Sequence, residues 1–268
     1  MKVVIFGPSG LLGESLVRIG LESGHIVVAA SRAEVNLEEE SSLMSFLNQN
    51  PADCYVYAAG LTSLEACLDN PERANALNVA SPTMIALAAK SQQAKFIYYS
   101  TDYVYSGRHE EDLTELVQAE PINIYGKSKR EGECSVQEVY ASSLVLRVSW
   151  LFGSGRDSFV DGVVESLLKN EERKYISDKW SVPNWTDDLA SMSYSLLELE
   201  AHGVVHLCSS GGSVSWYEYA LEVAETLEVL GLNKRSGEII RKSKMAEISG
   251  FRDRRPVSTG MSSSRIVE

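Results

Sequence analysis

The stretch GPSGLLG occupies residues 7–13, directly after a short apolar run at residues 3–6. Glycine recurs every third residue, where a predicted strand ends and an amphipathic helical pattern over residues 11–22 begins. The first glycine suits a tight turn, the second lets the backbone approach a pyrophosphate, and the third lets the helix pack close to the sheet. The positive end of that helix would face the phosphates. The predicted dinucleotide contacts in this turn are Gly7, Ser9, Gly10, Leu11, Leu12 and Gly13.

Outward from this turn, apolar strand-like runs alternate with helical patterns. The runs cover residues 26–30, 54–58, 95–100 and 143–150, and the helical patterns cover residues 43–48 and 75–91. Apolar strands separated by helices are typical of a parallel sheet that is covered on both faces. The fold class is therefore predicted as α/β, with a doubly wound parallel sheet of the Rossmann type.

The pattern loosens after residue 152, which indicates a smaller C-terminal lobe. We expect a dinucleotide-binding domain over residues 1–152, with a return segment at about residues 183–211. Residues 153–182 and 212–268 would form a substrate-binding lobe, which includes a predicted helix over residues 216–230.

Charge and composition exclude several classes of partner. The chain has 268 residues, with 25 Lys and Arg against 37 Asp and Glu, and thus a formal net charge of −12. Such a surface would repel nucleic acid and anionic membranes, and no apolar run approaches the roughly 20 residues that span a bilayer. Four scattered cysteines and the lack of an N-terminal export signal favour reduced thiols and a cytoplasmic location.

The end of the second predicted strand carries Ser31 and Arg32 in place of an acidic residue. An acidic residue there accepts hydrogen bonds from the ribose hydroxyls of NAD, whereas a guanidinium and a hydroxyl suit a 2′-phosphate. The predicted cofactor is therefore NADPH, with NADH as the alternative. The other interpretation of Arg32 is an ordinary solvated turn residue.

A second group of residues indicates proton transfer. Thr101 ends a predicted strand at the carboxyl edge of the sheet, and Tyr125 and Lys129 lie four residues apart on a predicted helix. A phenol has an ordinary pKa of about 10, and an adjacent ammonium lowers that pKa by stabilising the phenolate. Tyr125 is therefore the predicted acid, Lys129 its activator, and Thr101 a hydrogen-bond partner of a substrate carbonyl.

In order along the chain, these and further motifs resemble the extended short-chain dehydrogenase/reductases, specifically the dTDP-4-dehydrorhamnose reductase family. The matching segments are GPSGLLG (7–13), STDYVYSG (100–107), YGKSK (125–129), LRVSWLFG (146–153), residues 178–189, HLCSSGGSVSWYEYA (206–220) and RRPVS (254–258). They cover nearly the whole chain. The family reduces the C4 ketone of a nucleotide-linked 6-deoxy sugar with NAD(P)H, so a nucleotide sugar is the implied partner and a homodimer a possible assembly.

The resemblance also implies roles for individual residues. Tyr125 would protonate the new C4 oxygen, Lys129 would bind the nicotinamide ribose, and Thr101 would orient the ketone. The other cofactor positions that it implies are Asn36, Leu37, Ala58, Ala59 and Gly60, and the substrate positions are Leu64, Tyr103, Trp150 and Arg255. Trp150 is open to a second interpretation as a core tryptophan, and Arg255 as a surface arginine.

Local departures leave alternatives open. Related 4,6-dehydratases carry Asp-Glu after the strand-end Thr, whereas Tyr103 follows Asp102 here, so a reductase is favoured. An epimerase shares the Thr, Tyr and Lys. The ending departs from the family pattern at Gly260 and Met261, which keeps open a non-catalytic dinucleotide-binding regulatory subunit, similar to that of methionine adenosyltransferase.

No metal site is predicted. The charged run HEED at residues 109–112 is interpreted as a solvated loop, because no second cluster of ligands accompanies it.

Overall fold

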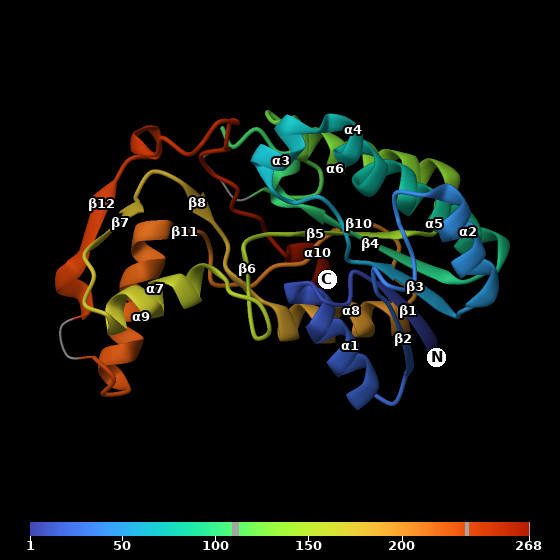
Figure 1. Ribbon diagram of the computed structural model, residues 1–268, viewed down its shortest axis with the longest axis horizontal. Coiled ribbons are helices and arrows are strands. Elements are labelled where there is room, and N and C mark those ends of the chain that lie inside the picture. Colours follow the sequence, from blue (N-terminus) through green and yellow to red (C-terminus); the bar gives the residue numbers. More distant parts are fainter. Residues whose placement is uncertain (109–112, 234–235, 268) are drawn as a thin grey trace.

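The computed structural model describes residues 1–108, 113–233 and 236–267. Its centre is a six-stranded sheet with the strand order β10-β5-β4-β3-β1-β2, and every neighbouring pair of strands is parallel (Figure 1). The strands are β1 (Lys2–Phe6), β2 (Ile26–Ala30), β3 (Cys54–Tyr57), β4 (Lys95–Thr101), β5 (Leu144–Val148) and β10 (Gly203–His206). The prediction of a doubly wound parallel sheet is confirmed.

Helices cover both faces of this sheet. Val3 and Ile5 of β1 belong to one apolar core and Val4 and Phe6 to the other, because successive side chains of a strand point to opposite faces. Full burial of a large apolar side chain contributes roughly 1.5–3 kcal/mol, so strands covered on both faces are apolar throughout. The helices on the first face are α1 (Leu11–Glu22) and α8 (Thr186–Glu198), and those on the second are α2 (Glu40–Gln49), α5 (Ser81–Ser91) and α6 (Ile124–Val139) (Figure 1).

The strand order changes direction between β1 and β3. The chain passes from β1 to β2 on one side of β1 and then crosses to place β3 on the other side. In open α/β sheets, ligands bind in the crevice that forms at such a point, beyond the carboxyl ends of the strands. The glycine turn after β1 and residues 58–60 after β3 both lie there.

The predicted helix over residues 75–91 is interrupted. It consists of α4 (Pro71–Asn75), a π-helical segment (Ala76–Ala80) and α5, and the short helix α3 (Leu64–Asp69) precedes it. A π-helical turn accommodates an extra residue and is frequent at functional sites. Apolar periodicity does not reveal such a turn, which is why a single helix was predicted.

A smaller lobe lies at the left of Figure 1. Helices α7 (Phe159–Leu168) and α9 (Trp216–Val229) pack against the parallel pair β7 (Arg173–Ile176) and β12 (Ile240–Ser243) around a core of their own. The predicted helix over residues 216–230 corresponds to α9, whereas α7 was not predicted. Two short strand pairs complete the connections: β6 (Leu151–Phe152) with β9 (Asn184–Trp185), and β8 (Trp180–Ser181) with β11 (Val214–Ser215).

The end of the chain returns from the small lobe to the sheet. Met261 forms an isolated bridge with Leu113, and α10 (Ser264–Val267) contacts β10. The predicted division of the chain into two domains stays a prediction, and it did not foresee these contacts of the tail. Within the described ranges, each helix is too short or too polar to cross a lipid bilayer.

Candidate active site

A pocket of about 310 Å³ lies in the crevice at the carboxyl ends of the strands. The sequence-predicted residues that line it are Gly7, Ser9, Gly10, Leu11, Leu12, Arg32, Leu37, Ala58, Ala59, Gly60, Tyr125 and Lys129. The lining residues that were not predicted are Pro8, Ala30, Val35, Thr62, Tyr99, Ser100, Val148, Leu151 and Arg156. The fold therefore brings the glycine turn and two of the three predicted reactive side chains to one cavity.

Two glycines of the turn occupy places that have no room for a side chain. Gly7 has a φ of +84°, and a Cβ there would lie 2.8 Å from the backbone nitrogen of Ala59. A Cβ on Gly13 would lie 2.0 Å from the carbonyl oxygen of Gly7. The turn thus packs backbone to backbone against α1 and against the loop after β3.

The N-terminus of α1 opens on the same pocket. Gly10 is its N-cap residue and no side chain caps this helix, so the first backbone N–H groups are available to an anion. In the described lining, Arg32, Lys129 and Arg156 supply positive charge and no carboxylate is present. The backbone cradle and this charge fit the diphosphate of a dinucleotide.

Asn78, in the π-helical segment, holds the loop after β3 in place. Its Oδ1 accepts the Leu61 N–H at 2.9 Å, and its Nδ2 donates to the Leu61 carbonyl and to Ser128 Oγ on α6 at 3.0 and 2.9 Å. A Cβ on Gly60 would lie 2.7 Å from the same Oδ1. Sequence reasoning missed Asn78, because only the local π-helical geometry identifies its contacts.

The end of the pocket near β2 differs in part from the prediction. Arg32 lines the pocket, whereas Ser31 and Asn36 are not among its lining residues. The Ser31 N–H donates to Glu34 Oε2 at 2.8 Å, and this bond holds the pKa of the Glu34 carboxyl below its usual value. Asn36 Oδ1 instead accepts the Glu38 N–H at 3.1 Å. An acidic side chain, that of Glu34, is therefore present close to the end of β2, three residues after Ser31.

Helix α6 presents Tyr125 and Lys129 to the pocket. The Tyr125 ring meets the Tyr103 ring edge-on, with 5.9 Å between centroids. Lys129 Nζ donates to the Tyr99 carbonyl oxygen at 2.6 Å and lies 4.1 Å from the centroid of the Tyr98 ring. The ammonium is therefore held by β4.

The pKa values of this pair depart from the prediction. Burial raises the pKa of Tyr125, and a hydrogen bond with the Thr101 side chain opposes the rise. Burial also lowers the pKa of Lys129 to about 7, against the opposing charge of Glu133. The structure does not show the predicted lowering of the Tyr125 pKa by Lys129, because the ammonium bonds to β4 and desolvation dominates.

Thr101 ends β4 and does not line the pocket, although its neighbour Ser100 does. Thr101 Oγ1 donates to Asp102 Oδ1 at 3.0 Å and accepts the Tyr103 N–H at 3.2 Å. The single hydroxyl proton of Thr101 is therefore directed at a buried carboxylate.

Arg255 is largely buried and paired, in contrast to its interpretation as a solvated surface arginine. Its guanidinium donates to Glu65 Oε1 at 2.8 Å and lies 3.5 Å from the centroid of the Phe251 ring. Burial raises the pKa of Tyr103, and the positive charge of Arg255 opposes that rise. Since Leu64 precedes Glu65 on α3, three predicted substrate residues come from segments that meet here.

Trp150 joins the sheet to an aromatic cluster of the small lobe. Its φ of +27° is unusual for a bulky residue, and its ring lies 5.0 Å from Phe159, 4.9 Å from Tyr219 and 5.8 Å from Trp216 between centroids. The next residue, Leu151, lines the pocket. Trp150 thus serves packing, and its strained backbone is typical of functional sites.

A buried ionic network fixes α6 against the sheet. Arg147 donates to both carboxylate oxygens of Glu133 at 2.8 and 2.7 Å, and to the Tyr105 hydroxyl at 2.7 Å. That hydroxyl lies 2.7 Å from His206 Nε2, and His206 Nδ1 lies 3.1 Å from the Ser262 carbonyl oxygen. Because a carbonyl only accepts, Nδ1 carries the proton, and burial lowers the pKa of His206.

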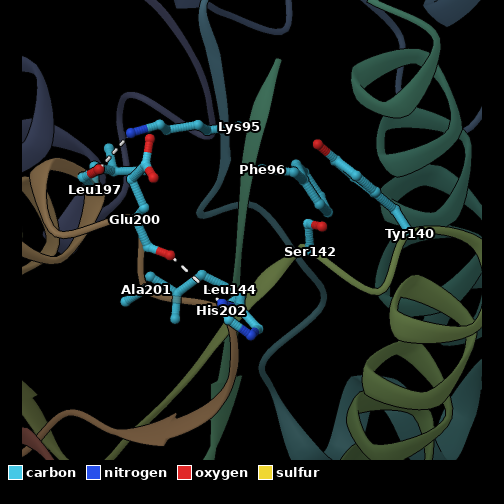
Figure 2. A pocket seen from close by; sticks show the side chains of 9 residues that line it. All are labelled: Lys95, Phe96, Tyr140, Ser142, Leu144, Leu197, Glu200, Ala201 and His202. Atoms are coloured by element: carbon cyan, nitrogen blue, oxygen red, sulfur yellow. Dashed lines mark hydrogen bonds between the residues drawn. The ribbon is translucent and has the colours of Figure 1, made fainter. Parts of the chain in front are cut away.

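A second pocket of about 240 Å³ opens at the opposite edge of the sheet, where β4 and β5 begin (Figure 2). Lys95 Nζ donates to the Leu197 carbonyl oxygen at 2.5 Å, and His202 Nδ1 lies 3.5 Å from the Glu200 carbonyl oxygen. The described lining of this pocket contains none of the predicted site residues.

Over the ranges that the structure describes, no three His, Cys, Asp or Glu side chains group in a way that would hold a metal ion. The charged run at residues 109–112 lies outside the described residues.

Short-chain dehydrogenase/reductases combine a glycine-lined crevice of this kind with a tyrosine and a lysine one helical turn apart. The present chain is an oxidoreductase of that class. A family model described as "RmlD substrate binding domain" matches residues 1–266, so the chain belongs to this family.

Its relatives agree with that membership. The chain is 30% identical over 226 residues to the spore coat polysaccharide biosynthesis protein SpsK of Bacillus subtilis, covering 84% of this chain and 78% of that protein. The solved structure of a dTDP-4-dehydrorhamnose reductase from Clostridium acetobutylicum has a TM-score of 0.90 at 25% identity, covering 98% of this chain and 91% of that one. A dTDP-4-dehydrorhamnose reductase from Bacillus anthracis, solved in complex with NADP, has a TM-score of 0.88 at 25% identity, covering 96% and 89%.

Proposed function

We propose that this protein reduces the C4 ketone of a nucleotide-linked 6-deoxy sugar, with NADPH as the hydride donor. The observation that carries the proposal is the position of Tyr125 and Lys129, one helical turn apart on α6, in the lining of the glycine-lined pocket. A phenol in that lining would serve as the proton donor to a ketone bound beside the dinucleotide. The two solved relatives are named for dTDP-4-dehydrorhamnose, which is the proposed substrate.

The cofactor would be held along the pocket from Arg32 to Lys129. The N-terminus of α1 and the glycine turn suit its diphosphate, Arg32 suits a 2′-phosphate, and Lys129 suits a ribose hydroxyl. Arg156 adds a further cation from the loop after β6. The NADP complex of the Bacillus anthracis relative supports this choice of cofactor.

Bound NADPH supplies a hydride to the ketone carbon. Tyr125 donates its phenolic proton to the carbonyl oxygen, so the product leaves as a neutral alcohol. Because burial raises the pKa of Tyr125, the phenol stays protonated until negative charge develops on that oxygen. The family resemblance assigns Thr101 to orienting the ketone, and for this its hydroxyl, which donates to Asp102 in the structure, would have to turn toward the pocket.

The sugar and its nucleotide would lie against the other predicted residues. Tyr103 contacts the Tyr125 ring and is the predicted cover for the apolar face of the sugar. Leu64 and Arg255 would face the nucleotide, and Trp150 would close the site from the side of the small lobe. These assignments rest on the family resemblance and on the meeting of their segments at Glu65 and Tyr103.

The decisive experiment is a panel of enzymatically made keto sugars, headed by dTDP-4-dehydrorhamnose, assayed with NADPH and NADH in parallel. We expect oxidation of NADPH at the rate of alcohol formation, and a higher kcat/KM with NADPH than with NADH. Absence of turnover on every sugar, together with co-purification of a synthetase, would instead support the regulatory-subunit alternative, which the reductase names of the solved relatives do not favour.

A further inference from the structure

The loop of residues 153–158 runs from β6 to α7 and brings Arg156 into the lining of the cofactor pocket. We call it the β6–α7 loop. The glycine turn and the first residues of α1 line the same pocket. The loop belongs to the connection with the small lobe, so its arginine reaches the pocket from a different part of the chain than the glycine turn does.

Two glycines let the β6–α7 loop lie directly on the helices that begin beside the pocket. A Cβ on Gly153 would overlap Oγ1 of Thr186, the first residue of α8. A Cβ on Gly155 would overlap Oε2 of Glu14, in the first turn of α1. The φ of Gly155 is also +105°, which residues with a side chain rarely adopt. The backbone that leads into Arg156 therefore packs closely against the starts of α1 and α8.

This packing places Arg156 next to the N-terminus of α1. The residue before it, Gly155, contacts the first turn of that helix. The helix has no side-chain cap, and its first residues line the pocket. A helix N-terminus favours phosphate through its free N–H groups, and a guanidinium favours phosphate through its charge and its fork of donors. Two anion-binding groups therefore adjoin each other at this end of the pocket.

Arg156 and Arg32 are kept apart from carboxylates. In the part of the chain that the structure describes, neither forms an ion pair, although Asp157 directly follows Arg156. Acidic residues outnumber basic ones by 37 to 25, so carboxylate partners are plentiful. The half-exposed arginines that do pair include Arg18, Arg73, Arg173, Arg241 and Arg252. Two unpaired guanidinium groups in one pocket indicate a ligand with more than one anionic group.

We propose that Arg156 binds the diphosphate of the dinucleotide, whereas Arg32 binds its 2′-phosphate. The assignment rests on the proposed function for the identity of the cofactor, and it gives each guanidinium a different phosphate. In dinucleotide-binding sheets the adenosine ribose lies at the end of the second strand, and the diphosphate lies at the N-terminus of the first helix. Arg32 follows β2, and Arg156 adjoins α1.

A diphosphate also occurs in the proposed sugar nucleotide, so two sources of the same chemistry have to be distinguished. The predicted substrate residues Leu64, Tyr103 and Arg255 come from α3, the end of β4 and the tail. The β6–α7 loop instead packs on α1 and α8. Its position therefore favours the diphosphate of the cofactor.

The test uses fragments that each carry one of the phosphate groups, namely ADP for the diphosphate and 2′-AMP for the 2′-phosphate. In Arg156→Ala, the Kd of ADP, NADH and NADPH should each rise about ten-fold, because all three contain the diphosphate. The Kd of 2′-AMP should stay at the wild-type value. Arg32→Ala should show the reverse, with weaker binding of 2′-AMP and NADPH and unchanged binding of ADP and NADH. Isothermal titration calorimetry measures these constants without a sugar substrate.

Matched variants separate the role of Arg156 from a general effect on the fold. Arg156→Lys keeps the charge without the fork and should lose less affinity for ADP than Arg156→Ala does. Gly155→Ala should displace Arg156 and weaken ADP binding. Gly212→Ala imposes similar strain at a φ of +79°, outside the pocket lining, and should leave ADP binding unchanged. Arg173→Ala removes the same charge from the small lobe and should leave every Kd unchanged.

Three outcomes in Arg156→Ala would overturn the assignment. The first is unchanged affinity for ADP. The second is equal weakening of ADP and 2′-AMP, which would indicate an effect on the adenosine site or on the fold. The third is weaker binding of dTDP with unchanged binding of ADP, which would assign Arg156 to the sugar nucleotide. If the wild type reduces no keto sugar while Arg156→Ala loses affinity for ADP alone, the proposed function fails and the role of Arg156 stands.

Discussion

At the glycine end of the crevice the walls are mainly backbone, whereas at the Tyr125 end they are buried polar side chains. The first end is one continuous turn, closed by the contact of Gly13 with the carbonyl of Gly7. The second end joins Thr101 and Asp102 to Ser181 and Thr259 across large distances in the sequence. Local sequence encodes a backbone cradle, but only the folded chain assembles such a set of titratable groups.

The two ends of the crevice also differ in the interactions on which they depend. A backbone cradle binds through steric fit and helix polarity, which substitutions perturb by packing. The buried polar end depends on desolvation, because an unpaired charge in the interior is costly. Substitutions at the Tyr125 end should therefore change rate, pH dependence and stability, and those at the glycine end mainly cofactor affinity.

The largest effect is expected for Tyr125→Phe. Loss of the phenolic proton should lower kcat by about 10²- to 10⁴-fold, while NADPH binding changes little, because the ring and its packing on Tyr103 remain. Stopped-flow kinetics and a fluorescence titration of NADPH measure the two quantities. Tyr140→Phe, at the end of the same helix, is the control and should retain full activity. Wild-type kcat in Tyr125→Phe would refute the assignment of the acid.

The next effect concerns stability at the buried end. Glu133→Gln leaves Arg147 without its bidentate partner, and we expect a loss of about 3–5 kcal/mol in the free energy of unfolding. The bonds to Arg147 hold the pKa of Glu133 below its ordinary 4.5. The ion pair therefore stabilises fully above pH 4.5, and this contribution is lost as the pH falls through the lowered folded-state value.

Urea denaturation at pH 7 and at acid pH measures this difference. The gap between the wild type and Glu133→Gln should narrow as the pH falls. Glu138→Gln, on the exposed face of α6, should change stability by less than about 0.5 kcal/mol. A gap that stays constant with pH would mean that the ion pair is not its source.

The same contrast explains what sequence could predict. The strands, α1 and the glycine turn follow from local periodicity and from glycine spacing, and Tyr125 and Lys129 from a spacing of four on one helix. Asn78 was not predicted because a π-helical turn determines where its side chain lies. Lys179, a buried lysine that lies over the Tyr103 ring, was not predicted because the residues around it come from other segments of the chain, and no sequence motif marks them.

The pKa of Tyr125 shows most clearly what could not be predicted from the sequence. Helical spacing correctly placed Tyr125 and Lys129 on one side of α6, but it could not reveal that Lys129 bonds to the Tyr99 carbonyl. Nor could it show that the fold leaves the phenol only partly exposed. Desolvation, which depends on the whole fold, therefore reverses the expected shift in the pKa of Tyr125.

At the glycine end, Gly13→Ala should cost about 1–3 kcal/mol of stability, since its Cβ would lie 2.0 Å from the Gly7 carbonyl oxygen. The shifted turn should also weaken NADPH binding by about ten-fold or more. Thermal melts and isothermal titration calorimetry report the two effects. Gly162→Ala in α7, where a Cβ meets nothing within 4 Å, should instead stabilise by about 0.5–1 kcal/mol. Similar behaviour of both variants would contradict the steric account.

The smallest effect is expected for Arg32→Ala, because an exposed guanidinium gains less from a phosphate than a buried one does. The KM for NADPH should rise about ten-fold, equivalent to about 1.4 kcal/mol, while the KM for NADH stays nearly constant. Glu34→Gln should act in the opposite direction, since it removes the carboxylate that bonds the Ser31 N–H beside the predicted 2′-phosphate position. Arg173→Ala, an exposed arginine of the small lobe, is the control for charge alone. An equal rise in the KM for NADPH and for NADH would show that Arg32 contacts the adenosine that both coenzymes share. The selectivity for NADPH at the glycine end would then have to come from Glu34 or Arg156.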